Sequence, residues 1–199
     1  MIELTADQTD ALTELINIGV GRAANALNEL TESHIILKVP HIEVYKHHEV
    51  DKISNRVGSG EVAAVLQGFH GKYQGRAALI FPPESALSLV LGVTGEEPVA
   101  SDLDAIQAGT LEEIGNIVIN ALIGTLGNLL ENALHFQLSE YKKDTLRNLF
   151  GSAADNDRSF MLMSEVHFII KKMNISGHII LTFDIDSIET LFQMIEDNF

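Results

Sequence analysis

One row of residues occurs twice in this chain, in the same register and at the spacing of a helix. Glu14 and Asn17 recur 99 positions later as Glu113 and Asn116. Steps of three and four residues place such a row on one helix face. The full rows are Glu14, Asn17, Gly21, Asn25, Asn28 and Glu32, then Glu113, Asn116, Asn120, Gly124, Gly127 and Glu131. We therefore predict two equivalent long helices and two homologous halves, about 1–98 and 99–199, within a single domain.

The composition of these rows is unusual for a surface helix. Gly and Asn are poor helix formers, and Gly costs about 1 kcal/mol relative to Ala inside a helix. An ordinary solvated face would carry Glu, Lys and Arg instead, and for either helix alone a solvated stripe is a sufficient interpretation. Because the row occurs twice, we favour a functional interpretation: small side chains on this helix face would let another molecule approach the helix backbone closely.

Hydrophobic periodicity predicts the same order of elements in each half: a long helix, three strands and a shorter helix. Two such units most economically pair their strands, so we predict a pseudo-two-fold α+β fold with one antiparallel sheet and both long helices on one face. The first long helix should bury Leu12, Leu15, Ile16, Ala23, Leu27 and Leu30. The expected segments are 9–31, 34–50, 61–68, 75–81 and 82–91, then 102–130, 134–141, 160–171, 176–183 and 184–196, with a polar loop at 151–159.

The composition excludes several classes of function. The 199 residues include no Cys, which removes thiolate metal sites and thiol nucleophiles. A net charge of −15 argues against nucleic acid as a partner. We see no secretory signal in the first residues and expect a cytosolic protein. The longest apolar stretch, 114–130, is interrupted by Asn and Gly, so we expect a buried helix and no membrane insertion.

Motifs for phosphate loops, dinucleotides, nucleophile elbows and zinc helices are absent from the sequence. One local cluster, His41, His47, His48 and Glu49, is worth weighing as a metal site. Strand alternation would place His41 and His47 on one face and His48 on the other, so we favour plain edge-strand residues and predict no metal.

The Glu/Asn pairs have a distinctive chemistry. A carboxylate accepts hydrogen bonds from a cation, whereas an amide one turn away both donates to and accepts from a water. Neither group is a nucleophile. Together they could hold a water in line with a phosphorus atom, as an amide does in GTPases. The reactive group and any metal would then belong to the partner.

The first pair lies in a longer motif, Asp10-x3-Glu14-x2-Asn17-x22-Pro40. This motif resembles the signature of the CheC/CheX/FliY family of chemotaxis phosphatases, which dephosphorylate the response regulator CheY. The sequences around Asn17 and Asn116 are also similar to that family. Because two motifs occur in one chain, the resemblance is closer to the CheC type than to the CheX type, which carries one.

The resemblance implies roles for individual residues. Asn17 and Asn116 would orient the attacking water, and Glu14 and Glu113 would contact a Lys of CheY. Mg²⁺ would arrive bound to CheY, so we expect no cofactor on this chain. The supporting motif positions are Asp10 and Pro40, whose counterparts in the second half are Gly109 and Ser139.

The expected partner is phosphorylated CheY or a similar receiver domain, and the resemblance adds CheD as a further candidate. An internally repeated chain already contains a two-fold arrangement, so we expect a monomer. Two alternatives remain open: a non-catalytic binding module like the middle domain of FliM, and a phosphatase that serves a receiver outside chemotaxis.

Overall fold

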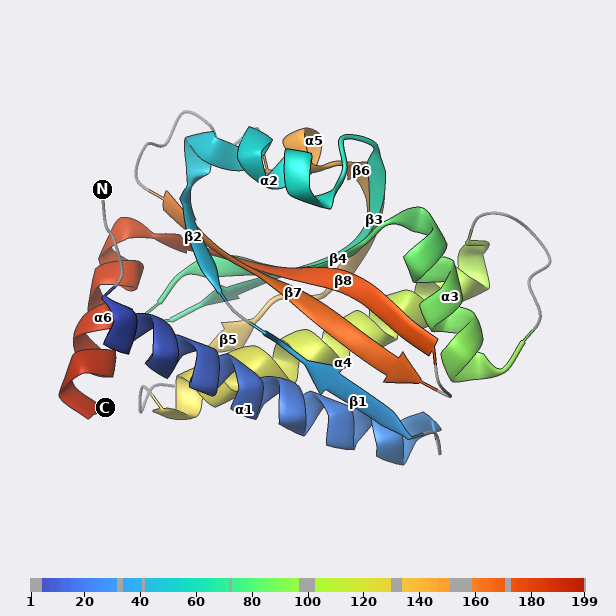
Figure 1. Ribbon diagram of the computed structural model, residues 1–199, viewed down its shortest axis with the longest axis horizontal. Coiled ribbons are helices and arrows are strands. Elements are labelled where there is room, and N and C mark those ends of the chain that lie inside the picture. Colours follow the sequence, from blue (N-terminus) through green and yellow to red (C-terminus); the bar gives the residue numbers. More distant parts are fainter. Residues whose placement is uncertain are drawn as a thin grey trace.

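The computed structural model describes residues 5–31, 34–40, 42–71, 73–96, 103–129, 134–150, 159–170 and 173–198. They form one curled sheet with helices on both faces (Figure 1). The first long helix and the elements after it are α1 (Ala6–Thr31), β1 (Ile35–Lys38), β2 (Glu43–Lys46), a 3-10 turn (His47–Glu49), α2 (Val50–Val57), β3 (Glu61–His70), β4 (Gly75–Phe81) and α3 (Pro83–Thr94). The second series is α4 (Ala105–Leu129), β5 (His135–Phe136), β6 (Glu140–Thr145), α5 (Leu146–Phe150), β7 (Ser159–Ile170), β8 (Met173–Asp184) and α6 (Ile185–Asn198).

The sheet joins the two series of elements by exchanging their edge strands. Its strand order is β1-β7-β8-β4-β3-β5, with β2 also pairing with β7 and β6 with β3. All pairs are antiparallel. The edge strands β1 and β2 of the first series therefore pair with β7 of the second series, and the edge strands β5 and β6 of the second series pair with β3 of the first. The predicted class, one antiparallel sheet with two long helices on one face, is confirmed; the division into two homologous halves stays a prediction.

The central pair, β4 with β8, fits the sequence match between 75–81 and 177–183. Ala78 pairs with Ile180, and these positions are 102 apart, the same offset that relates Gly75 to Gly177. Gly75 lies opposite Phe183, and a Cβ at Gly75 would come within 2.0 Å of the Thr182 carbonyl oxygen. A Cβ at Gly177 would likewise meet the Phe81 ring at 2.3 Å. Both glycines are thus required by close packing in the strands.

Each expected first strand is divided in two by a bulge. Lys38 pairs with His167 and Glu43 with Met163, so five steps along the edge match four along β7. Pro40 lies in this irregular segment, where the lack of an N–H costs no ladder hydrogen bond. In the second series, Phe136 pairs with Phe69 and Glu140 with Leu66, four steps against three. The expected strand 34–50 is therefore two short strands that end at Lys46, and the prediction was wrong for 47–50, which form the 3-10 turn and the start of α2. The expected strand 134–141 is also two strands, the second of which continues to Thr145.

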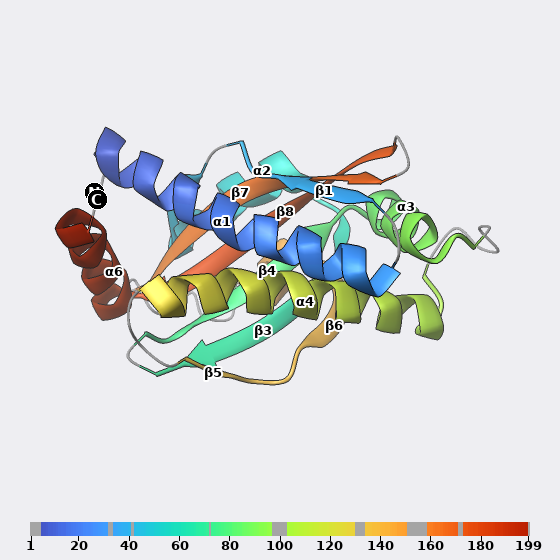
Figure 2. The same cartoon turned by 90° about the horizontal axis from the view of Figure 1, so that it is seen from below.

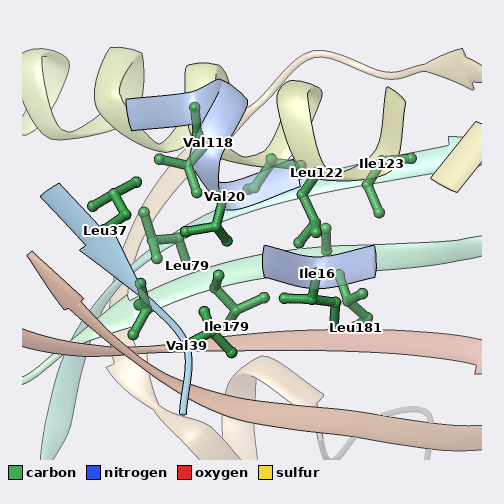
Figure 3. Close-up of a cluster of buried hydrophobic side chains, with 14 of the residues drawn as sticks. Ile16, Val20, Leu37, Val39, Leu79, Val118, Leu122, Ile123, Ile179 and Leu181 are labelled. Carbon is green, nitrogen blue, oxygen red and sulfur yellow. The ribbon is translucent and has the colours of Figure 1, made fainter. Parts of the chain in front are cut away.

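The two long helices run antiparallel across one face of the sheet, and the larger core lies between them and the strands (Figure 2). Ile16 and Val20 from α1 and Val118 and Leu122 from α4 meet strand residues such as Leu79 (Figure 3). Of the six α1 side chains predicted to be buried, five are buried, but Leu30 is 60% exposed. Leu30 follows the apolar periodicity of the helix, but it lies in the last turn, beyond Leu27, the last helix residue that is buried in the core.

The crossing of α1 and α4 depends on one small residue. A Cβ at Gly19 would lie 2.9 Å from the Leu122 Cα and 3.0 Å from its Cδ1. Backbone cannot yield as a flexible side chain does, so any side chain here pushes the helices apart. Gly21, two residues later, faces open space. No helix in the described part of the chain is long and apolar enough to cross a membrane.

Two short helices that the sequence analysis did not predict, α2 and α5, cover the other face of the sheet (Figure 1). They bury Ile53, Leu146 and Phe150 against Ala64 and Ile180. At the edge of this layer, Arg56 donates to Glu43 and Tyr45. His178 lies beside a hollow of about 180 Å³ that Glu43, Arg56 and Glu165 also line.

We expect Gly19→Ala to lower the free energy of unfolding by about 1 to 2 kcal/mol, because the close helix contact outweighs the gain in helix propensity. Gly21→Ala is the matched control and should raise it by up to about 1 kcal/mol, since its Cβ meets no neighbour. Urea unfolding measures both. Equal effects of the two substitutions would contradict this account of the helix crossing.

Burial lowers the pKa of His178 below its ordinary value, with smaller contributions from Arg56 and His167 against an opposing one from Glu165. The unfolded chain then binds the proton more readily as the pH falls, so stability should decline from about pH 6.5 downwards. NMR titration of the ring should give a pKa below 6.5, and His178→Gln should lose less stability between pH 7 and 5. A ring pKa at or above 6.5 would contradict this prediction.

Candidate functional site

The first Glu/Asn pair lies on the outer side of α1. Leu15 and Ile16, between the two residues, are buried and fix the rotation of the helix. Glu14 is therefore exposed and Asn17, one turn later, is half-buried. Within the described residues the Asn17 amide makes no hydrogen bond, so both its oxygen and its nitrogen are available to a partner or a water.

The second pair has the same placement on α4 but a different environment. Glu113 is exposed and Asn116 is half-buried. The Asn116 Oδ1 accepts hydrogen bonds from the Asn120 Nδ2 at 2.9 Å and from the Gln67 Nε2 at 3.4 Å. The two pairs thus share a geometry along the helix, and only the second is tied to neighbouring side-chain amides in the described part of the chain.

The supporting positions also differ between the two pairs. Asp10 is exposed one turn before Glu14, and Pro40 is exposed at the bulge of the β1–β2 edge. Gly109 stands in the place of Asp10 and faces open space. Ser139 stands in the place of Pro40, and its hydroxyl donates to a carboxylate oxygen of Glu112 at 3.4 Å. The second site therefore replaces a rigid Pro by a hydrogen bond to α4.

The remaining residues of the repeated row have mixed roles. Gly21 and Asn25 are exposed, and a Cβ at Gly21 or Gly124 would meet nothing within 4 Å, as expected of a low surface. Asn28 instead has a structural role, because its Oδ1 accepts the Ile35 N–H at 2.6 Å and so anchors the start of β1. Gly127 is buried. Glu32 and Glu131 lie outside the described residues.

Apolar side chains are exposed beside both pairs. Ile18, next to Asn17, is 40% exposed. Leu138, at the β5–β6 bulge, is 95% exposed and lies at a hollow of about 290 Å³ that Gln67 and Ser139 also line. Single exposed apolar side chains are common on protein surfaces, so the Glu/Asn pairs and not these two residues identify the candidate site.

The sequence analysis missed Gln67. It is 4% exposed and lies on β3 beneath α4, where its Nε2 donates to the Gln137 carbonyl oxygen at 3.0 Å and to Asn116. The available signal was a polar residue within the apolar run 62–69. An isolated Gln in a buried strand needs hydrogen-bond partners, but the sequence does not say which ones.

The His-rich segment gives no metal centre in the part of the chain that is described. No group of three or more His, Asp or Glu side chains gathers there in a way that could hold a metal ion. His41 lies outside the described residues, and His48 is exposed. Glu49 accepts hydrogen bonds from the Lys52 ammonium at 2.5 Å and the Lys46 N–H at 2.9 Å, which lower its pKa.

Comparison with known proteins agrees with the motif. A model of the CheC-like family matches residues 8–44, which include Asp10, Glu14, Asn17 and Pro40. The CheY-P phosphatase CheC of Bacillus subtilis (strain 168) is 25% identical over 202 residues, covering 94% of this chain and 92% of its own.

Solved structures share the fold over the whole chain. The crystal structure of Thermotoga maritima FliY matches with a TM-score of 0.78 and 19% identity, covering 100% of both chains. The FliM middle domain from H. pylori matches with a TM-score of 0.66 and 12% identity, covering 96% of this chain and 99% of that one.

The fold defines the structural class: the chain has the α+β architecture of FliY and of the FliM middle domain. The resemblance to the CheC/CheX/FliY family is confirmed: residues 8–44 match the CheC-like family model, and the similarity to the CheY-P phosphatase CheC extends over 94% of the chain.

Asn28 and Asn25 provide a test of which amides in the repeated row are structural. Asn28→Ala should lower the free energy of unfolding by about 1 to 3 kcal/mol, because it leaves the N–H of the buried Ile35 at the start of β1 without its acceptor. Asn25→Ala, at an exposed position, should leave it unchanged or slightly raised. Urea unfolding of both variants measures the difference, and equal stabilities would refute the anchoring role of Asn28.

Proposed function

We propose that this protein is an aspartyl-phosphate phosphatase that acts on the phosphorylated response regulator CheY through two sites. Glu14 and Asn17 form one site, and Glu113 and Asn116 form the other. The observation that carries the proposal is the repetition of an exposed Glu and a half-buried Asn, one turn apart, on two neighbouring helices. The similarity to a CheY-P phosphatase over 94% of the chain supports the same substrate.

In the proposed reaction, Asn17 or Asn116 holds a water in line with the phosphorus. The water oxygen forms a bond to phosphorus while the bond from phosphorus to the aspartyl oxygen breaks, and the water proton leaves with inorganic phosphate or to solvent. A carboxylate is a good leaving group, with a pKa near 4, so no general acid is needed. Positioning of the water is then the main contribution that this chain has to make.

Glu14 and Glu113 have the complementary role of binding the substrate. An exposed carboxylate one turn from the Asn is placed to accept from a Lys beside the phosphoryl group of the regulator. Mg²⁺ would belong to the regulator and offset the phosphate charge there. The net charge of −15 would steer a regulator with a basic surface towards the helices, and the cytosol is the expected location.

A binding module without catalysis is the second candidate, because the fold of the FliM middle domain matches this chain with a TM-score of 0.66. At 12% sequence identity, this match is evidence for a shared fold and not for a shared function. The two Glu/Asn pairs favour the phosphatase, since a plain docking surface has no need of an amide at the same helical position twice. A receiver domain outside chemotaxis remains a further substrate candidate, because the pairs would address features common to receivers.

The test is the decay of phosphorylated CheY, generated with a small-molecule phosphodonor in Mg²⁺. Catalytic amounts of this protein should accelerate it, and the Asn17→Ala/Asn116→Ala variant should lose at least a hundredfold of that acceleration, because each site loses its water-positioning amide. Each single variant should retain activity from the remaining site.

Far-UV circular dichroism and urea unfolding of the double variant provide the control for folding. Retained phosphatase activity in a folded double variant would refute the roles of the two Asn residues. Tight binding of phosphorylated CheY with no acceleration by the wild type would favour the binding module instead.

A further inference from the structure

The amide of Asn116 is part of a small hydrogen-bonded cluster beneath α4. The Gln67 Nε2 donates to the Gln137 carbonyl oxygen at 3.0 Å and to the Asn116 Oδ1 at 3.4 Å. The Asn120 Nδ2 donates to the same Asn116 oxygen at 2.9 Å. Three side-chain amides and one backbone carbonyl therefore meet below the second candidate site.

The backbone carbonyl settles which way each amide points. A carbonyl only accepts, so Gln67 must turn its NH₂ group towards Gln137. The second hydrogen of that NH₂ group is then directed to Asn116, which must present its oxygen. Asn120 also donates to this oxygen, so both lone pairs of the Asn116 Oδ1 are engaged.

This arrangement leaves the nitrogen of Asn116 free. The Asn116 Nδ2 makes no hydrogen bond within the described residues, and it does not belong to the buried polar atoms that lack a partner there. It is therefore accessible from outside. The Gln67 Oε1 and the Asn120 Oδ1, in contrast, are buried without a donor in the described part of the chain. Both side-chain donors of the cluster thus point to the Asn116 oxygen, whereas the oxygens of Gln67 and Asn120 have no donor among the described residues. A purely structural network usually pairs its buried acceptors as well.

The first candidate site has neither of the two donors. Gly21 stands in the place of Asn120, 99 positions earlier, and it carries no side chain. Ser164 stands in the place of Gln67: Gln67 pairs with Ala77 and Ser164 with Ile179, and Ala77 and Ile179 are equivalent in the match between β4 and β8. The Ser164 hydroxyl donates to the Glu165 carbonyl oxygen at 3.2 Å.

We propose that Gln67 and Asn120 are positioning residues that fix the Asn116 amide with its NH₂ group outward, so that the second site presents a donor to the attacking water. The first site, whose Asn17 amide is held by no such partners, has to select this orientation when the substrate binds. The two sites are then unequal in catalysis although they carry the same pair. This inference rests on the proposed phosphatase function.

A donor in this position suits the chemistry of attack. A water that accepts a hydrogen bond from Nδ2 through one lone pair keeps its other lone pair for the phosphorus. Fixing the amide before the substrate arrives removes the wrong orientation from the free enzyme, which raises the turnover rate and leaves substrate binding through Glu113 unaffected. The effect should therefore fall on kcat and not on KM.

The experiment isolates each site and then alters the cluster. Asn17→Ala leaves only the second site, and Asn116→Ala leaves only the first. Gln67→Met keeps the side-chain volume and removes both donated hydrogen bonds. With phosphorylated CheY as substrate, we expect this substitution to lower kcat of the second-site protein by roughly three- to tenfold, the scale of one hydrogen bond that distinguishes the two amide orientations, with KM within twofold of its parent. The first-site protein should keep its parent's kcat.

A converse substitution tests the same idea by gain of activity. Gly21→Asn restores the missing donor at the first site, where a new side chain meets no neighbour within 4 Å of its Cβ. In the Asn116→Ala background it should raise kcat severalfold.

Several outcomes would overturn the proposal. A Gln67→Met effect below twofold at the second site would do so, as would an equal loss at both sites, which would mean a structural role. No gain from Gly21→Asn would remove the explanation for unequal sites.

An NMR measurement separates this proposal from the phosphatase function itself. In the unmodified protein, side-chain NH₂ protons of Gln67 and Asn120 should exchange slowly with water, whereas those of Asn116 should exchange fast. Slow exchange at Asn116 would overturn the assigned orientation whether or not the protein is active. If both single-site parents fail to accelerate the decay of phosphorylated CheY, the proposed function fails, and this exchange pattern still decides the orientation.

Discussion

The pairing of β4 with β8 is the interaction on which the rest of the structure depends. These strands are the centre of the sheet, and every other strand is attached to one of them directly or through β3 or β7. Their register, with Ala78 opposite Ile180, sets where the larger core lies and hence where α1 and α4 rest. The glycines at Gly75 and Gly177 permit the close approach that this register requires. The two Glu/Asn pairs receive equivalent positions because both helices pack on this centre.

Local periodicity was sufficient to predict the long elements. The helices α1 and α4 and the strands β3, β4, β7 and β8 follow hydrophobic patterns that the neighbouring sequence determines. The bulges that divide the first strand of each series were not predictable, because they arise from a register difference with β7 and β3 far along the chain. The helices α2 and α5 were missed for a related reason: they are short, and packing on the sheet stabilises them more than their own propensity does.

The candidate site divides in the same way. Glu14 with Asn17, and Glu113 with Asn116, could be placed together from the sequence, because residues three apart share a helix face whatever the fold. The contact of Gln67 with Asn116 could not, since it joins positions 49 apart through the stacking of α4 on β3. Asn28 is the opposite case. It lies on the same helix face as Glu14 and Asn17, so the sequence grouped it with the candidate site, but its side chain accepts a hydrogen bond from the backbone of β1. Periodicity reveals which face a residue occupies and not what it meets there.

The exchange of edge strands has a consequence for how this chain acquires its fold. Glu61 in β3 pairs with Thr145, and Ile35 in β1 pairs with Ile170, so the outer ladders of the sheet close over 84 and 135 positions. Contacts this distant along the chain are formed late and slow the folding of a domain. During synthesis, β3 leaves the ribosome long before β5 and β6 exist, and its outer edge stays open until they follow. The first series of elements therefore cannot complete its sheet before the second series is synthesised. Until then the nascent chain has an unpaired strand edge and is most prone to aggregation.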